Sequence, residues 1–404
     1  MFAFIHPDVR SDAFILVRHV LNVEINRGVE IPRGGKLDTP RVRSVGRPDD
    51  YPKILDFVVL RAMTTGHLLG SWSLAIREVP MWFERLMGFV EESPDQVRAN
   101  IEHDGETLVS RVNGRRVTCG RLETPSLAEL RRSTVSLTQG GAQTATEVVG
   151  DVTALHEDPG NARALFQAAS QFNLLEMTDH DVTPEQGVGI YECDRTQGPA
   201  CAIACGGGTI LRNYFVQVDG QIGQTASRQI DCLADLGGAL GGPGLWDMRN
   251  GYALATDAGL RQANAHLTAA SEEERDELRG LLRIGVQHDV EVIGTDHLVT
   301  QVYGSAMPVA YGEPRPSQWE PLARLVLEAS YEATILTARK CGIDHVYLTL
   351  LGGGVFSNDD AWIEDSVLRA LSMADGLDVR IVSHRQSSPA VRRIIEAHRI
   401  TARS

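Results

Sequence analysis

Long apolar runs are missing from this sequence, and so is a recognisable export signal. No run approaches the roughly 18 residues that a membrane-spanning helix needs, and one of the longest apolar stretches, 346–356, is broken by glycines. The first residues, 1–12, have neither the basic nor the apolar part of a secretory signal peptide. We therefore expect a cytoplasmic protein without a membrane partner.

Cysteine is also sparse, with six residues in a chain of 404. In a long chain without an export signal, these residues are expected to be reduced thiols. Cys193, Cys201 and Cys205 lack the CxxC spacing of zinc sites, and His180 has no His or Cys partner at ligand spacing. The sequence therefore predicts no metal site.

Basic residues are outnumbered by acidic ones, 39 against 53, which gives a net charge of −14. An acidic surface repels nucleic-acid phosphates and anionic lipids, so non-specific binding to either is not expected. The content of apolar residues, 43%, and of charged residues, 23%, is that of a folded globular protein. The length predicts two or three domains at about 150 residues each.

The order of the predicted elements is typical of an α/β fold. Residues 1–135 read as an N-terminal α/β region without a chemical signature, and the Ser/Thr/Gln/Gly-rich segment 133–146 is predicted as a loop. From residue 147 onward, short β-rich runs alternate with helical patterns. The later elements are predicted as a helix ending near Gly342, a strand at 345–351, a helix at 360–372 and a strand at 377–383.

Two glycine clusters lie between these elements. The triplet 352–354 follows a buried strand, where backbone N–H groups and the next helix N-terminus can hold an anion. It lacks the GK[ST] of a P-loop and the GxGxxG of a dinucleotide site, so neither ATP hydrolysis nor a nicotinamide cofactor is predicted, and no other cofactor is expected. A plain strand-to-helix turn is the alternative. The second cluster, 206–208, follows a helix of small residues at 199–204 and precedes a β-like run at 209–216.

Two polar residues follow predicted strands. Asp151 lies at the carboxyl end of the strand that starts at residue 147, the edge where α/β proteins bind ligands. A helix N-cap is the alternative for Asp151. Asn173 ends an apolar stretch, where its carboxamide can hold a ribose hydroxyl, and an ordinary loop Asn is the alternative.

Three segments, GDVT (150–153), FQAASQFNLL (166–175) and LTLLGGGVF (348–356), together resemble the macrodomain superfamily, whose members bind ADP-ribose. The resemblance covers about 147–384 and includes distant similarity to domains of the poly(ADP-ribose) glycohydrolase type. It implies a diverged and enlarged macrodomain-like domain at 147–404, with a mixed sheet flanked by helices on both faces. It also implies an insertion at about 217–300 and makes 1–135 an accessory extension of unknown role.

The resemblance also assigns binding roles. Asp151 would bind the adenine amino group, with Val152 beside it through its backbone. Asn173 would hold the distal ribose, and Phe356 would pack against that ribose. The diphosphate would be wrapped by Gly352, Gly353, Gly354 and Val355.

The helix of small residues lacks the acids that hydrolytic relatives place near it, since Ala200, Cys201 and Ala202 stand at the aligned positions. A catalytic carboxylate would have to come from the preceding inserted loop. Glu192 is the first candidate and Asp194 the second. Either would activate or position water against the anomeric carbon of the distal ribose, so the expected function is hydrolysis of an ADP-ribosyl linkage.

Two alternatives remain open. The missing acids favour a module that binds ADP-ribose or a related nucleotide without turnover. A cysteine-dependent hydrolase would use Cys201 as nucleophile and Gln197 as oxyanion donor. The spacing of four between these residues differs from the spacing of six in papain-like proteases, and no His motif follows.

Overall fold

The computed structural model describes residues 81–135, 143–194 and 196–401. The described residues all belong to one compact unit, Glu78–Ser404. Most of the predicted accessory region 1–135 therefore lies outside the described residues, whereas 81–135 shares one unit with the residues that follow. Within the described residues, no helix is long and apolar enough to cross a membrane.

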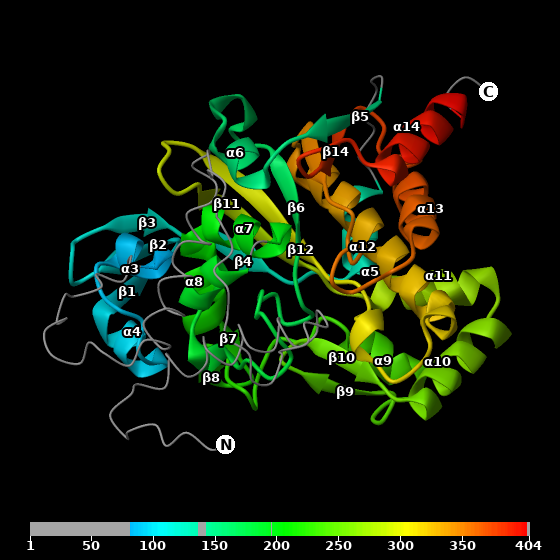
Figure 1. Cartoon of the computed structure of the whole chain (residues 1–404), viewed down its shortest axis with the longest axis horizontal. Coiled ribbons are helices and arrows are strands. Elements are labelled where there is room, and N and C mark those ends of the chain that lie inside the picture. The colour runs from blue at the N-terminus through cyan, green and yellow to red at the C-terminus, as the bar shows by residue number, and fades with distance from the viewer. Residues whose placement is uncertain (1–80, 136–142, 195, 402–404) are drawn as a thin grey trace, which may run out of the picture. The chain divides into compact units, whose positions relative to one another are not determined.

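A seven-stranded mixed sheet forms the centre of this unit, in the order β4-β11-β12-β6-β13-β14-β5 (Figure 1). The strands are β4 (Arg121–Glu123), β5 (Thr144–Val149), β6 (Leu165–Ala169), β11 (Gly285–Glu291), β12 (Leu298–Gly304), β13 (His345–Leu348) and β14 (Asp378–Ser383). The five strands from β12 to β5 run parallel, while β11 pairs antiparallel with both β12 and β4. The mixed α/β fold predicted from the sequence is thus confirmed.

Helices cover both faces of the sheet, as the alternating side chains of β6 demonstrate. The Phe166 ring stacks on His156 of α6 (Val152–Glu157), with ring centroids 3.8 Å apart. The next residue, Gln167, donates from Nε2 to Thr334 Oγ1 at 2.9 Å. Thr334 belongs to α12 (Glu320–Cys341), which ends at the left-handed Gly342. Because successive strand residues point to opposite faces, α6 and α12 lie on opposite sides of β6.

The remaining helices surround this core. The helix α13 (Asp360–Leu371) matches the helix predicted at 360–372. The last helix, α14 (Pro389–Thr401), was not predicted. Two consecutive helices, α7 (Gln197–Ala204) and α8 (Gly206–Tyr214), follow the loop after β6. The strand predicted at 209–216 was wrong, because these residues form most of α8.

The region of the predicted insertion, 217–300, contains both peripheral and central elements. The peripheral elements are β7 (Gln217–Val218), β8 (Gln221–Ile222), α9 (Ala234–Leu240), β9 (Trp246–Arg249), β10 (Tyr252–Ala255), α10 (Asp257–Ala269) and α11 (Glu272–Leu281). The central sheet resumes at Gly285, so β11 and the start of β12 fall inside the predicted range.

The first described elements precede the sheet in the sequence. They are α3 (Trp82–Met87), α4 (Pro94–Asn100), the antiparallel strands β1 (Ile101–Asp104), β2 (Thr107–Ser110) and β3 (Arg116–Thr118), and then α5 (Leu127–Thr134). A second hydrophobic cluster joins α3 and α4 to α8 and to the loop before α7. The chain before β4 is therefore packed against elements that lie about a hundred residues later.

Candidate functional site

A cavity of about 350 Å³ opens beside the carboxyl ends of the parallel strands β6, β13 and β14. This volume lies within the roughly 300–1,000 Å³ of cavities that bind small molecules. The strand ends contribute Ala169, Leu348 and Ser383 to its wall. The cavity thus occupies the edge of the sheet at which α/β proteins bind ligands.

Four helices begin at this cavity. The wall contains the first residue of each of them: Val152 of α6, Gln197 of α7, Asp360 of α13 and Pro389 of α14. Helix N-termini carry partial positive charge and unpaired N–H groups. No Lys or Arg belongs to the described lining. Backbone dipoles, rather than cationic side chains, therefore make this cavity suited to an anion.

The glycine loop 352–354 forms one side of the cavity. Gly352 has φ +70°, and a Cβ at this residue would lie 2.5 Å from both Ala306 Cβ and Asn358 Nδ2, so the fold itself requires glycine there. Gly353 and Gly354 line the cavity. A Cβ at Gly354 would meet nothing within 4 Å. The space beside Gly354 is therefore open to a ligand.

The residues expected at the adenine end lie together at the start of α6. Val152 is buried and lines the cavity. Asp151 is exposed and caps α6, since its Oδ1 accepts from Thr153 N at 2.8 Å. Asp151 directly precedes Val152 but is not itself among the residues that line the cavity. The cap is the alternative that the sequence offered for Asp151.

Asn173 is fully buried and is bonded within the protein. Its Nδ2 donates to Gln229 Oε1 at 2.8 Å, and its Oδ1 accepts from Leu175 N at 3.1 Å. Gln229 Nε2 then donates to Asn250 Oδ1, and Asn250 Nδ2 donates to the His180 carbonyl. In this structure, the carboxamide of Asn173 fixes the loop after β6.

Phe356 lies in an aromatic cluster with His180, Tyr252 and Tyr311. Its ring centroid is 5.4 Å from that of Tyr252 and 5.8 Å from that of Tyr311. None of these four side chains lines the cavity, and neither do Gly352 and the exposed Val355. Burial raises the pKa of both tyrosines, and the negative charges of Asp179 and Asp194 raise it further. Phe356 thus belongs to an aromatic cluster outside the cavity.

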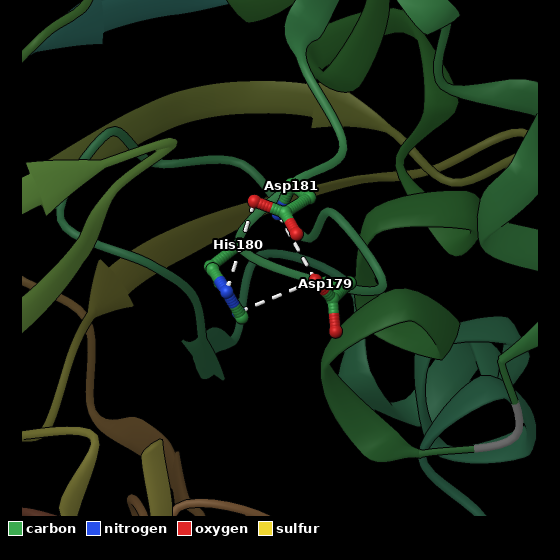
Figure 2. Close-up of side chains that lie close together, drawn as sticks. All are labelled: Asp179, His180 and Asp181. Carbon is green, nitrogen blue, oxygen red and sulfur yellow. Dashed lines mark hydrogen bonds and ion pairs between the residues drawn. The ribbon is translucent and has the colours of Figure 1, made fainter. Parts of the chain in front are cut away.

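Figure 2 shows three consecutive side chains, Asp179, His180 and Asp181. His180 also belongs to the aromatic cluster. Each of the three side chains has one atom of the kind that can bind a metal ion, a ring nitrogen or a carboxylate oxygen, and these three atoms lie within 4.8 Å of one another. His180 Nδ1 is 3.2 Å from Asp179 Oδ1, and Arg249 Nη1 is 3.3 Å from Asp181 Oδ1. These side chains form a partly exposed ion-pair group outside the cavity.

Glu192, the first catalytic candidate, is engaged at α3. Its Oε2 accepts from the Trp82 backbone N–H at 2.7 Å, and its Oε1 lies 2.8 Å from Arg85 Nη2. Glu91 binds the same loop, because it accepts from the backbone N–H groups of Val188 and Gly189 at 3.0 and 2.6 Å. We call these contacts between 82–91 and 188–192 the loop clamp. Glu192 does not line the cavity.

Asp194, the second candidate, lies nearer to α7. Its Oδ1 accepts from Thr196 N at 2.8 Å, just before the helix begins. Its negative charge raises the pKa of Glu176, an effect second only to burial. Glu176 is a buried acid that the sequence interpretation missed. The available signal was a single charge within the apolar run 172–177.

Cys201 lines the cavity but is 2% exposed. Burial raises the pKa of its thiol, and the charges of Glu176 and Asp151 raise it further. A raised pKa keeps sulfur in the weakly nucleophilic thiol form. The environment of Cys201 therefore argues against a cysteine-dependent hydrolase.

A buried network fixes two walls of the cavity relative to each other. Gln301 on β12 donates to the Cys201 carbonyl at 2.9 Å and lies 3.0 Å from His156 Nε2. His156 Nδ1 lies 2.7 Å from the Val152 carbonyl. This geometry fits a neutral ring that donates from Nδ1 and accepts at Nε2. The starts of α6 and α7 are thereby tied to the sheet through one His and one Gln.

Comparisons with known proteins return solved structures alone. No protein-family model and no curated protein matches the sequence. Poly(ADP-ribose) glycohydrolase from Thermomonospora curvata is 14% identical, with 76% of this chain and 97% of that chain covered and a TM-score of 0.40. The same enzyme bound to the inhibitor ADP-HPD is 13% identical, with 76% of this chain and 97% of that chain covered and a TM-score of 0.39. Poly(ADP-ribose) glycohydrolase from Deinococcus radiodurans in complex with ADP-ribose is 16% identical, with 69% of this chain and 94% of that chain covered and a TM-score of 0.38. These similarities are distant in both sequence and superposition.

Proposed function

We propose that this protein binds ADP-ribose or an ADP-ribosyl derivative in the cavity and hydrolyses an ADP-ribosyl linkage. One observation carries the proposal: the three segments that resemble the macrodomain superfamily meet at a single cavity. Val152 comes from the first segment, Ala169 from the second and Gly353 from the third. Segments separated by long stretches of sequence have no local reason to converge on one cavity, so their meeting supports a shared ligand.

The charge distribution of the cavity supports a diphosphate. The N-termini of α7, α13 and α14 direct partial positive charge toward an anion in the cavity, and the backbone N–H of Gly354 offers a donor. The N–H of Gly353 is already bonded to the Leu350 carbonyl at 3.2 Å. In our proposal, the diphosphate lies along the glycine loop. The adenine lies toward Asp151 and Val152, and the distal ribose lies toward Phe356 and Asp194.

A binding module without turnover is the second candidate function. Asp360 is the one carboxylate among the described cavity residues, and α7 has no acid in its sequence. Hydrolysis in our proposal therefore depends on acids that lie outside the lining of the cavity, such as Asp194 and Glu176.

Calorimetric titration of the full chain with ADP-ribose tests the proposal. We expect micromolar binding by the wild type and at least a tenfold loss, about 1.4 kcal/mol, in Gly354→Leu. Gly354 is exposed and has open space around it, so the leucine enters the ligand's space without disturbing the fold. Gly238→Leu is the matched control, since a Cβ at Gly238 in α9 also meets nothing within 4 Å.

Turnover is tested separately, with the release of ADP-ribose from ADP-ribosylated protein and from poly(ADP-ribose) measured by chromatography. Binding together with release supports the hydrolase. Binding without release assigns the protein to the module class. The absence of ADP-ribose binding by the wild type would overturn the proposal.

A further inference from the structure

Glu176 is a buried acid whose carboxyl group the rest of the protein leaves unsatisfied. The residue is 7% exposed, and its Oε1 has no hydrogen-bond partner. Its backbone N–H donates to the Tyr191 hydroxyl at 2.9 Å, which fixes the chain at this point. Because burying a polar group without a partner costs free energy, an unsatisfied carboxyl next to a ligand cavity calls for a functional reason.

The carboxyl lies against the first turn of α7. A Cβ at Gly198 would be 2.5 Å from Glu176 Oε2, so glycine is needed for this close approach. Gln197, the residue before Gly198, and Cys201, three residues after it, both line the cavity, whereas Glu176 lies behind Gly198 and is not itself a lining residue. Gln197 Oε1 is also buried without a partner. The first turn of α7 therefore carries one unsatisfied polar group and packs against a second.

The surroundings favour a neutral carboxylic acid. Burial raises the pKa of Glu176 well above its ordinary value, and the charge of Asp194 raises it further, against the opposing charge of Arg212. The other titratable groups near it are Tyr191, Tyr252 and Cys201, and burial raises the pKa of each, so all three stay uncharged. Two acids held in different environments are the usual arrangement of an acid and its partner in catalysis.

We propose that Glu176 is a catalytic residue of this site and donates a proton to the leaving group when the ADP-ribosyl bond is cleaved. This inference rests on the proposed function. It assigns the role to an acid before α7 rather than to one on that helix.

The reaction then balances with water as the one co-reactant. The bond between the anomeric carbon and the leaving atom breaks, and its electron pair stays with the leaving group, which takes the proton of Glu176. Water forms the new carbon–oxygen bond, and the proton that it loses returns to the Glu176 carboxylate. The negative charge of Asp194 favours this return.

The test compares Glu176→Gln with the wild type in ADP-ribose release and in ADP-ribose binding. We expect release to fall at least about 100-fold, while the Kd changes less than threefold, because an amide replaces a neutral acid of the same shape. Glu176→Asp, which keeps an acid, should recover part of the rate. Glu273→Gln, at an exposed residue of α11, controls for the exchange of acid for amide.

The pH dependence of the wild type gives a second test that needs no variant to fold. The rate must fall as the pH rises through the raised pKa of Glu176, because the acid loses the proton it donates. An unchanged release rate in Glu176→Gln, or a wild-type profile with no fall on the alkaline side, would remove Glu176 from the mechanism. Failure of the wild type to bind ADP-ribose would instead refute the function on which this inference rests.

Discussion

Gly198 and the carboxyl group of Glu176 approach each other closely beside the cavity. A methyl group at residue 198 has no room beside the buried carboxyl. Such overpacking forces either the helix or the acid to move. The start of α7 and the position of Glu176 therefore depend on each other.

We expect Gly198→Ala to lower the free energy of unfolding by about 1–3 kcal/mol. The loss should shrink when Glu176→Ala is added, because the shortened side chain leaves room for the methyl group. Urea unfolding of the four members of this cycle measures the coupling. Gly238→Ala in α9 should cause no loss, and equal losses from Gly198→Ala with and without Glu176 would contradict the described contact.

The placement of residues at the cavity was predictable where it depends on local sequence. Val152, Gly353 and Gly354 follow strands in recognisable segments, and the structure places all three at the cavity. Glu192 illustrates the opposite case. Its partners Trp82 and Arg85 lie more than a hundred residues away. No spacing in the sequence encodes such a contact, and the burial of Glu176 is hidden for the same reason.

At the scale of elements, the relation between α6 and α7 depends on the protonation state of His156. Burial lowers the pKa of His156 from 6.5 to about 4. The neutral ring accepts at Nε2 from Gln301, and a protonated ring would present a second donor to that amide. A fall in pH therefore weakens the hydrogen bonds that connect α6 and α7 to β12 through His156 and Gln301.

The direction in which pH changes the free energy of unfolding follows from the linkage between proton binding and folding. A His whose pKa is lowered by folding stabilises the protein above the unfolded pKa, and that stability is lost as the pH falls from about 6.5 toward 4. The shift corresponds to about 3 kcal/mol. Urea unfolding between pH 7 and pH 4 should show a shallower decline in His156→Phe than in the wild type. An unchanged slope would exclude His156 as the cause, and the exposed His266→Gln serves as control.

The helix α8 shows why element prediction failed at one place. Its run of β-branched and aromatic residues favours a strand. However, Gly206 and Gly207 allow the helix to approach other parts of the chain, since Cβ atoms there would lie 2.5 Å from Trp82 and 2.7 Å from Val117. Packing against the segment before β4 overrides local propensity, and the sequence of α8 alone does not contain that segment.

At the scale of the whole described unit, an ion-pair network joins four helices. Glu332 of α12 is 2% exposed and bonds Arg131 of α5 through both oxygens, at 2.6 and 2.9 Å. Arg131 also bonds Asp276 of α11, and Arg369 of α13 reaches Asp276 at 2.9 Å. Removing Glu332 takes from Arg131 the buried one of its two acid partners and leaves Asp276 as the other.

We expect Glu332→Gln to lower the free energy of unfolding by about 3 kcal/mol, because buried pairs resist the loss of one partner. Glu320→Gln is the matched control on the same helix, since its pair with Arg324 is half exposed and should contribute less than about 1 kcal/mol. Urea unfolding at constant salt compares the two. Similar losses would mean that burial does not strengthen the network.

The class of the fold was predictable from the sequence, but the order of the strands in the sheet was not. Alternating β-rich and helical patterns predict a mixed α/β sheet, and the C-terminal strands and helices lie close to their predicted ranges. The edge strand β4 and its neighbour β11 were hidden, because β4 is only three residues long and its partner lies far along the chain. Non-sequential pairing leaves no mark on local periodicity.

The loop clamp has a consequence for how this protein can change over generations. Glu91 and Glu192 hold two stretches together that are about a hundred positions apart, and each acid binds backbone N–H groups of the other stretch. Because the N–H groups of Trp82, Val188 and Gly189 belong to the backbone, they remain when the side chains at these residues change. The two acids are the members whose loss leaves those N–H groups unmatched, so Glu91 and Glu192 are expected to be inherited together while the residues that supply the N–H groups vary more freely.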